Sequence, residues 1–310
     1  MDPVFIGFLL SHKIGPIGPI GRIPPINLSS PRKPIIASTH QKPEAPPVNR
    51  IDALFSTLRA KNQRGFIAYL SAGDPHLEAT RQLVLALDKV GVDLIELGVP
   101  FSDPLADGAV NQAAAQRALE SGTTMHGVFE TIAAIRRESE IPIVLYTYLN
   151  PLYAYGIGKF EKDAATAGVD GVLILDLTPE EDAAEFTGTG LLKRIRLIAP
   201  TTPPDRIALI AKRAEGFIYY VSREGVTGEQ TAVATSIVER VALIRAASDL
   251  PIAIGFGVST PEQAREVAAS GDAVVVGSAI VRRIAEHGKE TDLADRVAAF
   301  VAPLVAAVKN

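Results

Sequence analysis

The sequence contains no cysteine, and only 5 of its 310 residues are histidine. Without cysteine the chain has no disulfide, no thiolate ligand for an iron–sulfur cluster and no thiol nucleophile, and it fits a reducing compartment. The histidines form no H-E-x-x-H motif and no other spacing typical of a metal pair. We therefore expect a cytoplasmic protein whose chemistry uses no metal.

Long apolar runs and basic clusters are also missing. The longest apolar runs, such as residues 5–10 and 273–277, are far shorter than the roughly 20 residues of a membrane-spanning helix. The formal net charge is −4, and no stretch is rich in Lys and Arg or interleaves them with aromatic residues. We expect neither a membrane nor a nucleic acid as partner.

Residues 1–47 differ in composition from the rest of the chain. They hold ten of the 22 prolines and show no helical or strand periodicity, so we interpret them as a disordered Pro-rich leader. Five Lys or Arg against two Asp or Glu give this segment a net charge of +3, which leaves an organelle transit peptide open. The segment lacks the basic start and the small-residue cleavage site that a secretory signal would have.

Short β-rich runs alternate with longer amphipathic stretches from Arg50 onward. Most of the short runs are almost wholly apolar, as strands buried on both faces are. Eight such units predict an α/β fold, a (β/α)8 TIM barrel of parallel strands with extra helices, as one catalytic domain over residues 48–310. An open doubly wound sheet would need a Gly-rich dinucleotide turn after the first strand, and residues 71–75 do not form one. The predicted strands are 66–71, 94–97, 143–147, 171–175, 195–199, 217–221, 252–255 and 273–276, and the predicted helices are 77–90, 109–121, 125–137, 183–186, 205–214, 235–247 and 261–270.

Glu96 lies inside one of these apolar strands, in the run 93–108 (DLIELGVPFSDPLADG). Burial of a carboxyl group without a partner is costly, so we expect its pKa to rise toward neutrality, as a general acid and base requires. The alternative is a carboxylate paired with Lys or Arg from a neighbouring strand. Asp107 follows in the loop, where we expect it to be ionised, and where Asp-Gly is also an ordinary turn pair.

Glycine-containing turns follow the seventh and eighth predicted strands, at Gly257 and at Gly277 with Ser278. Glycines let backbone N–H groups approach an anion, a helix N-terminus adds unpaired donors, and many barrels hold a phosphate at these two loops. We predict a phosphate site here. The alternative is that the glycines only turn the chain.

Five separated segments together resemble the tryptophan synthase alpha chain family. They are residues 66–75 (FIAYLSAGDP), 96–108 (ELGVPFSDPLADG), 146–151 (YTYLNP), 222–228 (SREGVTG) and 255–258 (GFGV). The resemblance extends over residues 50–310 and implies retro-aldol cleavage of indole-3-glycerol phosphate to indole and glyceraldehyde 3-phosphate. Members commonly begin just before a sequence like that at Arg50. This favours the hypothesis that residues 1–47 are not translated and that Val48 is the start, which peptide mapping of native protein would test.

The resemblance also implies a role for each matching residue. Glu96 would be the acid and base, and Asp107 would hold the indole nitrogen. Tyr219 would line the pocket near the cleaved bond, with core packing as its alternative, and Thr227 would lie in a loop that closes over the site. Phe256 would pack on the substrate, and the phosphate contacts would be Gly228, Gly257, Gly277 and Ser278.

A partner follows from the same resemblance, namely a beta chain that uses pyridoxal phosphate to join indole to serine, in an alpha2-beta2 heterotetramer. Asp103 and Pro104 would contact it, and this chain would bind no cofactor of its own. Three alternatives remain open: a stand-alone indole-releasing lyase, a catalytically silent regulatory subunit, and another phosphate-binding barrel enzyme, which should lack the pairing of Glu96 with Asp107.

Three positions depart from the family pattern. Ala109 and Asn111 stand where members usually have a proline and an apolar residue, and Tyr69 replaces a common Phe. We therefore expect a more mobile loop after the second strand and a more polar indole pocket.

Overall fold

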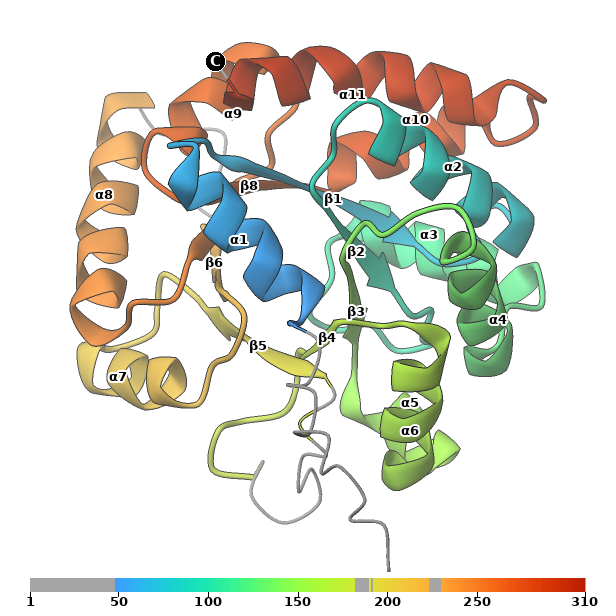
Figure 1. The fold of residues 1–310 in the computed structure, drawn as a ribbon, viewed down its shortest axis with the longest axis horizontal. Helices are drawn as coiled ribbons and strands as arrows, with labels where there is room; N and C mark the ends of the chain where they lie inside the picture. Colours follow the sequence, from blue (N-terminus) through green and yellow to red (C-terminus); the bar gives the residue numbers. More distant parts are fainter. Residues whose placement is uncertain (1–47, 182–189, 191, 223–229, 310) are drawn as a thin grey trace, which may run out of the picture. The chain divides into compact units, whose positions relative to one another are not determined.

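Eight parallel strands close into a barrel in chain order, each pairing with the next and β8 pairing with β1 (Figure 1). The computed structural model describes residues 48–181, 190, 192–222 and 230–309. This confirms the predicted TIM barrel, and each predicted strand is found with its ends shifted by two residues at most. The strands are β1 (Gly65–Ser71), β2 (Leu94–Gly98), β3 (Ile143–Thr147), β4 (Gly171–Ile174), β5 (Lys193–Ile198), β6 (Ile218–Val221), β7 (Ile252–Gly255) and β8 (Ala273–Val276).

Helices surround the barrel, and the segments after β2 and after β3 each contain two of them (Figure 1). The pair after β2 agrees with the prediction, whereas the pair after β3 was not predicted. The predicted helix 183–186 and the predicted leader 1–47 lie outside the described residues. The helices are α1 (Arg50–Ala60), α2 (Leu77–Lys89), α3 (Ala109–Glu120), α4 (Met125–Ile135), α5 (Leu149–Tyr155), α6 (Ile157–Ala167), α7 (Pro204–Lys212), α8 (Gln230–Ala247), α9 (Pro261–Ala268), α10 (Ser278–His287) and α11 (Leu293–Lys309).

The inside of the barrel is a packed apolar core closed at one end by α1. Alternate residues of each strand point inward, among them Ile67 of β1, Leu94 of β2 and Val144 of β3, and they form one buried cluster. The apolar face of α1 packs against this cluster through Ile51, Phe55 and Leu58. Figure 1 shows α1 lying across the barrel on the side that faces the viewer. Because side chains alternate along a strand, the next inward positions are Tyr69, Glu96 and Tyr146. Tyr69 and Glu96 are paired neighbours on β1 and β2.

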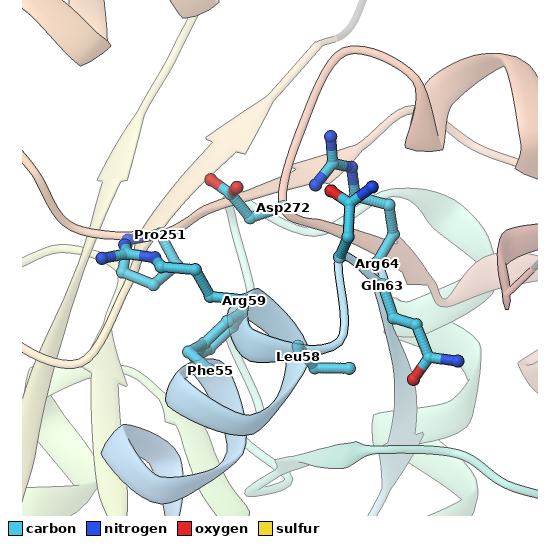
Figure 2. A pocket seen from close by; sticks show the side chains of 8 residues that line it. Phe55, Leu58, Arg59, Gln63, Arg64, Pro251 and Asp272 are labelled. Atoms are coloured by element: carbon cyan, nitrogen blue, oxygen red, sulfur yellow. The ribbon is translucent and has the colours of Figure 1, made fainter.

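A small cavity of about 70 Å³ lies beside α1, at the end of the barrel where the strands begin (Figure 2). Its wall includes Arg59 of α1, Arg64 just before β1, and Asp272 just before β8. Conserved chemistry in such barrels sits at the opposite end, where the strands finish. We therefore assign this small cavity to the packing of α1 and look for the site at the other end.

Charged side chains tie distant parts of the chain together at this same end. Asp170, just before β4, has a side chain only 3% exposed and accepts from Arg50 at 3.0 Å and from Arg136 at 2.8 Å. Its carboxylate also accepts the backbone N–H of Ile143 at 2.8 Å, at the start of β3. These contacts join α1, α4 and two strands at one carboxylate.

Two features are absent from the described residues. None of their helices combines the length and apolar character needed to cross a bilayer. Nor do three or more of their His, Asp or Glu side chains gather as a metal site would require.

Candidate active site

A cavity of about 480 Å³ opens at the end of the barrel where the strands finish. Its wall combines inward-facing tyrosines of β1, β3 and β6, the loop after β2, and the glycine turns after β7 and β8. This is the position where barrel enzymes place their chemistry. The cavity is therefore the candidate active site.

Glu96 is fully buried on the inward face of β2. Neither carboxyl oxygen has a hydrogen-bond partner among the described residues, and no Lys or Arg of that part of the chain pairs with it. Burial alone raises the pKa of Glu96 from 4.5 to about 8. The expected pKa rise is confirmed, and a carboxyl group that is protonated at neutral pH can donate a proton.

Three tyrosines surround this carboxyl group in the same inner layer. Tyr69, Tyr146 and Tyr219 all line the cavity, and burial followed by the nearby Asp107 and Glu96 carboxylates raises the pKa of Tyr69. The pKa values of Tyr146 and Tyr219 are also raised, first by burial, and the Glu96 carboxylate contributes to both. The three phenols therefore stay neutral over the physiological pH range and present hydroxyl groups to the cavity.

Glycines at the ends of two strands make room for these rings. A Cβ atom on Gly98 would overlap the hydroxyl of Tyr69, and one on Gly255 would lie 2.7 Å from the hydroxyl of Tyr219. Ordinary Cβ atoms do not approach other atoms so closely. The absence of side chains at Gly98 and Gly255 thus allows the hydroxyl ends of two tyrosines to lie close to the strand backbone.

Asp107 lies in the loop after β2 and lines the same cavity. Its two carboxylate oxygens each accept a phenol hydroxyl, Oδ1 from Tyr146 at 3.2 Å and Oδ2 from Tyr148 at 2.8 Å. Tyr148 in turn accepts the backbone N–H of Ala106 at 3.0 Å. These two hydrogen bonds hold the Asp107 side chain at the cavity wall.

The other end of the cavity has the features of an anion site. Gly277 precedes α10, Ser278 is its first residue, and both line the cavity together with Gly257. Gly257 has a φ of +70°, a left-handed conformation that favours glycine over other residues. Arg282, one turn further along α10, is the one cationic side chain among the described lining residues. Among the described residues it makes no ion pair.

The structure brings five of the predicted site residues to one cavity wall, namely Asp107, Tyr219, Gly257, Gly277 and Ser278. Glu96 lies in the same inner layer as the lining tyrosines. Phe256 is partly buried against the outer apolar core, and the described cavity wall does not include it. Thr227 and Gly228 lie outside the described residues, and Asp103 is exposed in the loop that carries Asp107.

Two residues of this cavity that the sequence analysis gave no role bear on the site, Tyr146 and Arg282. For Tyr146 a signal was present, because it follows Val144 by two positions and so shares the inward face of its strand. For Arg282 the signal is weaker. Its spacing of four from Ser278 places both residues on one face of the helix, but this indicates an anion contact only if the start of that helix is already taken to bind an anion. Asn111 also lines the cavity, and its carboxamide oxygen is buried without a hydrogen-bond partner among the described residues.

Comparison with known proteins gives one consistent family. A sequence model of the family described as tryptophan synthase alpha chain matches residues 55–309. The tryptophan synthase alpha chain of Opitutus terrae is 51% identical over 267 residues, covering 85% of this chain and 100% of that one. The alpha chain of a Geobacter species is 45% identical over 260 residues, covering 83% and 97%.

Solved structures agree. Tryptophan synthase subunit alpha from Legionella pneumophila has a TM-score of 0.78 at 36% identity, with 84% of this chain and 98% of that chain covered. A chain of Mycobacterium tuberculosis tryptophan synthase has a TM-score of 0.76 at 34% identity, with coverage of 84% and 99%. The similarity in both sequence and structure therefore extends over the whole barrel.

Proposed function

The chain belongs to the tryptophan synthase alpha chain family, and from this membership we propose which of its residues carry out the reaction and what it assembles with. The chain is a lyase that cleaves indole-3-glycerol phosphate to indole and glyceraldehyde 3-phosphate in tryptophan biosynthesis. The cavity has one end suited to an indole ring and another suited to a phosphate. The substrate has these two ends joined by a short glycerol chain.

The proposed acid and base is Glu96. In its protonated form it delivers a proton to the indole carbon that bears the glycerol chain. The resulting carboxylate then takes the proton of the adjacent hydroxyl group, the carbon–carbon bond breaks, and its electron pair returns to the ring. Glu96 is thereby protonated again. A carboxyl group with a pKa of about 8 suits both halves of this cycle at neutral pH.

Asp107 is the proposed partner of the indole N–H. Protonation of the ring carbon leaves positive charge on the ring nitrogen, and a carboxylate beside it stabilises that charge most in the transition state. Tyr219 lines the same cavity and is placed to contact the substrate between its two ends. Thr227, which lies outside the described residues, keeps its proposed role in loop closure. The position of Phe256, against the outer apolar core and outside the described cavity wall, does not support its proposed packing on the substrate.

The substrate's phosphate is proposed to bind at the N-terminus of α10. Ser278 and Gly277 supply N–H groups there, Gly257 lies on the same cavity wall, and Arg282 adds a positive charge. Gly228 remains a proposed phosphate contact outside the described residues. Without that arginine, the described cavity wall would offer its substrate dianion no cationic side chain.

We further propose that the chain pairs with a tryptophan synthase beta chain as an alpha2-beta2 heterotetramer, in the cytoplasm. Pyridoxal phosphate then belongs to the beta chain, and this chain needs no cofactor. Asp103 and Pro104 lie in the loop of Asp107 at the cavity mouth, and the next residue, Leu105, is 89% exposed. An exposed leucine at this position is suited to packing against a partner.

The observation that carries the proposed mechanism is that Glu96 is buried and that its carboxyl oxygens have no hydrogen-bond partner among the described residues. It lies in the same layer as the tyrosines that line a cavity with a proposed phosphate site. The test is indole release from indole-3-glycerol phosphate while a beta chain is titrated in, with Glu96→Gln as control. We expect low basal release that rises to saturation and is lost in the variant. A rate of indole release that does not change as the beta chain is added would indicate a stand-alone lyase. Stimulation of the beta-chain reaction without indole release would indicate a silent regulatory subunit.

A further inference from the structure

Tyr146 contacts the loop of Asp107 at both of its ends. The loop leaves β2 at Val99, whose backbone N–H donates to the carbonyl oxygen of Tyr146 at 2.9 Å. It returns to the same residue at Asp107, whose Oδ1 accepts the Tyr146 hydroxyl at 3.2 Å. One strand residue thus holds the start of the loop by its backbone and the carboxylate near its end by its side chain.

The Tyr146 side chain is itself held firmly. Its backbone lies in the middle of three paired strands, next to Gly98 of β2 and Leu173 of β4. Its ring packs edge-on against Tyr69, with ring centroids 5.1 Å apart and an interplanar angle of 76°. A donor that is fixed by strand pairing and ring packing positions its acceptor better than a donor on a loop.

The two tyrosines that contact Asp107 therefore differ in what they connect. Tyr148 bonds both Asp107 and the backbone of Ala106, so it braces the loop against itself as well as against the end of β3. Among the described residues the Tyr146 hydroxyl bonds only the Asp107 carboxylate, and the Tyr146 ring is anchored in the barrel interior. Burial raises the pKa of Tyr146, with Asp107 as the next cause, so the hydroxyl stays protonated and donates.

We propose that Tyr146 is a positioning residue for the reaction: its hydroxyl holds the Asp107 carboxylate in the place where it receives the indole N–H. This rests on the proposed role of Asp107 in cleaving indole-3-glycerol phosphate. Each carboxylate oxygen has two lone pairs, so bonding to the phenol does not by itself prevent an oxygen from accepting the indole N–H. Tyr146 thus acts through Asp107 and takes no part in proton transfer.

The first test is Tyr146→Phe in the full chain with its beta partner. The variant keeps the ring and its packing on Tyr69 and loses only the hydroxyl. We expect kcat to fall about tenfold, the usual effect of losing a hydrogen bond to a charged group, with KM within about twofold. The matched control is Tyr155→Phe, which also removes a tyrosine–aspartate bond, to Asp163 at 2.7 Å between α5 and α6, and should leave both constants unchanged.

A double-mutant cycle separates positioning from a general structural effect. In an Asp107→Ala background the hydroxyl has no carboxylate to hold, so Tyr146→Phe should change kcat by less than about twofold there. An equal loss in both backgrounds, or no loss in either, would overturn the proposal while leaving the lyase activity established. Absence of indole release by the unmodified chain would instead reject the proposed function, and this inference with it.

Discussion

Glu96 makes the free energy of unfolding depend on pH in an unusual direction. Burial raises its pKa from 4.5 to about 8, so the folded protein holds this proton at neutral pH and the unfolded chain does not. Between about pH 4.5 and about pH 8 the folded state binds one proton more, and the free energy of unfolding falls by up to ~1.4 kcal/mol per pH unit. Above about pH 8 both states are ionised and the loss stops.

Glu96→Gln, which cannot ionise, should lack this part of the pH dependence. We expect the variant to match the unmodified protein near pH 4.5 and to exceed its unfolding free energy by ~2–4 kcal/mol near pH 9. Urea unfolding of both proteins at the two pH values measures the effect. A difference that does not change with pH would mean that Glu96 ionises as an exposed carboxyl group does. In the unmodified enzyme, kcat/KM should also fall above about pH 8, as the proton donor is lost.

Arg282 and Arg283 are neighbours in α10 that face different surroundings. Arg282 lines the cavity, whereas Arg283 pairs with Glu286 at 2.7 Å and lies 4.9 Å from the ring centroid of Phe300 in α11. We expect Arg282→Gln to raise KM about fivefold to twentyfold with little change in kcat, because it weakens binding of the phosphate in ground and transition states alike. Arg283→Gln is the control and should leave KM unchanged. Equal KM values for the two variants would remove Arg282 from the phosphate site.

The sequence allowed the buried environment of Glu96 to be predicted. Leu94, Ile95 and Leu97 form an apolar strand that has to be buried, and Glu96 lies within it. It did not allow the contacts of Asp107 to be predicted. Those depend on the loop that runs from β2 to α3 and contacts Tyr146 and Tyr148, and the path of a ten-residue loop is not encoded in periodicity. The resemblance named Asp107 as a site residue, and the hydroxyl groups that hold it emerged only from the structure.

At the scale of elements, α3 is held in place by a salt bridge to the first loop of the barrel. Arg117 of α3 makes a two-pronged contact to Asp74 after β1, at 2.8 and 2.7 Å, and Asp74 is only 1% exposed. Because α3 begins two residues after Asp107, this contact also fixes where the catalytic loop ends.

Arg117→Ala should therefore lower both stability and activity, since it leaves a buried carboxylate without its cation. We expect a loss of ~2–3 kcal/mol in the free energy of unfolding, below the full range for a buried pair because the Arg117 side chain is 34% exposed. Arg81→Ala, which breaks an exposed contact to Glu78, is the comparison and should cost less than ~1 kcal/mol. Urea unfolding gives both values. Similar losses for the two variants would show that Asp74 is not effectively buried.

Strands were easier to predict than helices for a physical reason. Strands buried on both faces must be apolar throughout, so β3, β7 and β8 were predicted with their observed bounds. The pair α5 and α6 escaped prediction because Gly156, with a φ of +91°, ends the first helix and begins the second. The resulting helices are short, with 7 and 11 residues, so each shows few repeats of the helical period, and α5 contains Pro151 near its start.

At the scale of the whole molecule, the contacts of Asp170 lie at one end of the barrel and the candidate active site lies at the other. The Asp170 carboxylate joins α1, α4 and the start of β3 at the end closed by α1. Neither Asp170 nor its partners line the catalytic cavity. Barrels of this class separate stability from function in this way.

Asp170→Asn should test the separation. It removes the charge that Arg50 and Arg136 share, and we expect the free energy of unfolding to fall by ~2–4 kcal/mol. At 25 °C, where the variant remains folded, kcat/KM for indole release should stay within about twofold of the unmodified value. Thermal unfolding and steady-state kinetics on the same preparation give both numbers. A parallel loss of kcat/KM would show that the two ends of the barrel are coupled.

The filling of one barrel end by α1 has a consequence for the order in which products should depart. Ile51, Phe55 and Leu58 fill that end, whereas Arg282 on the cavity wall is exposed at the other. If the phosphate binds at Arg282 and indole forms beside the buried Glu96, as proposed, we expect glyceraldehyde 3-phosphate to leave first and indole to leave last through the same passage. A beta chain docked over that passage would receive indole as the final departure of every turnover, and each new substrate would have to wait until the transfer was complete.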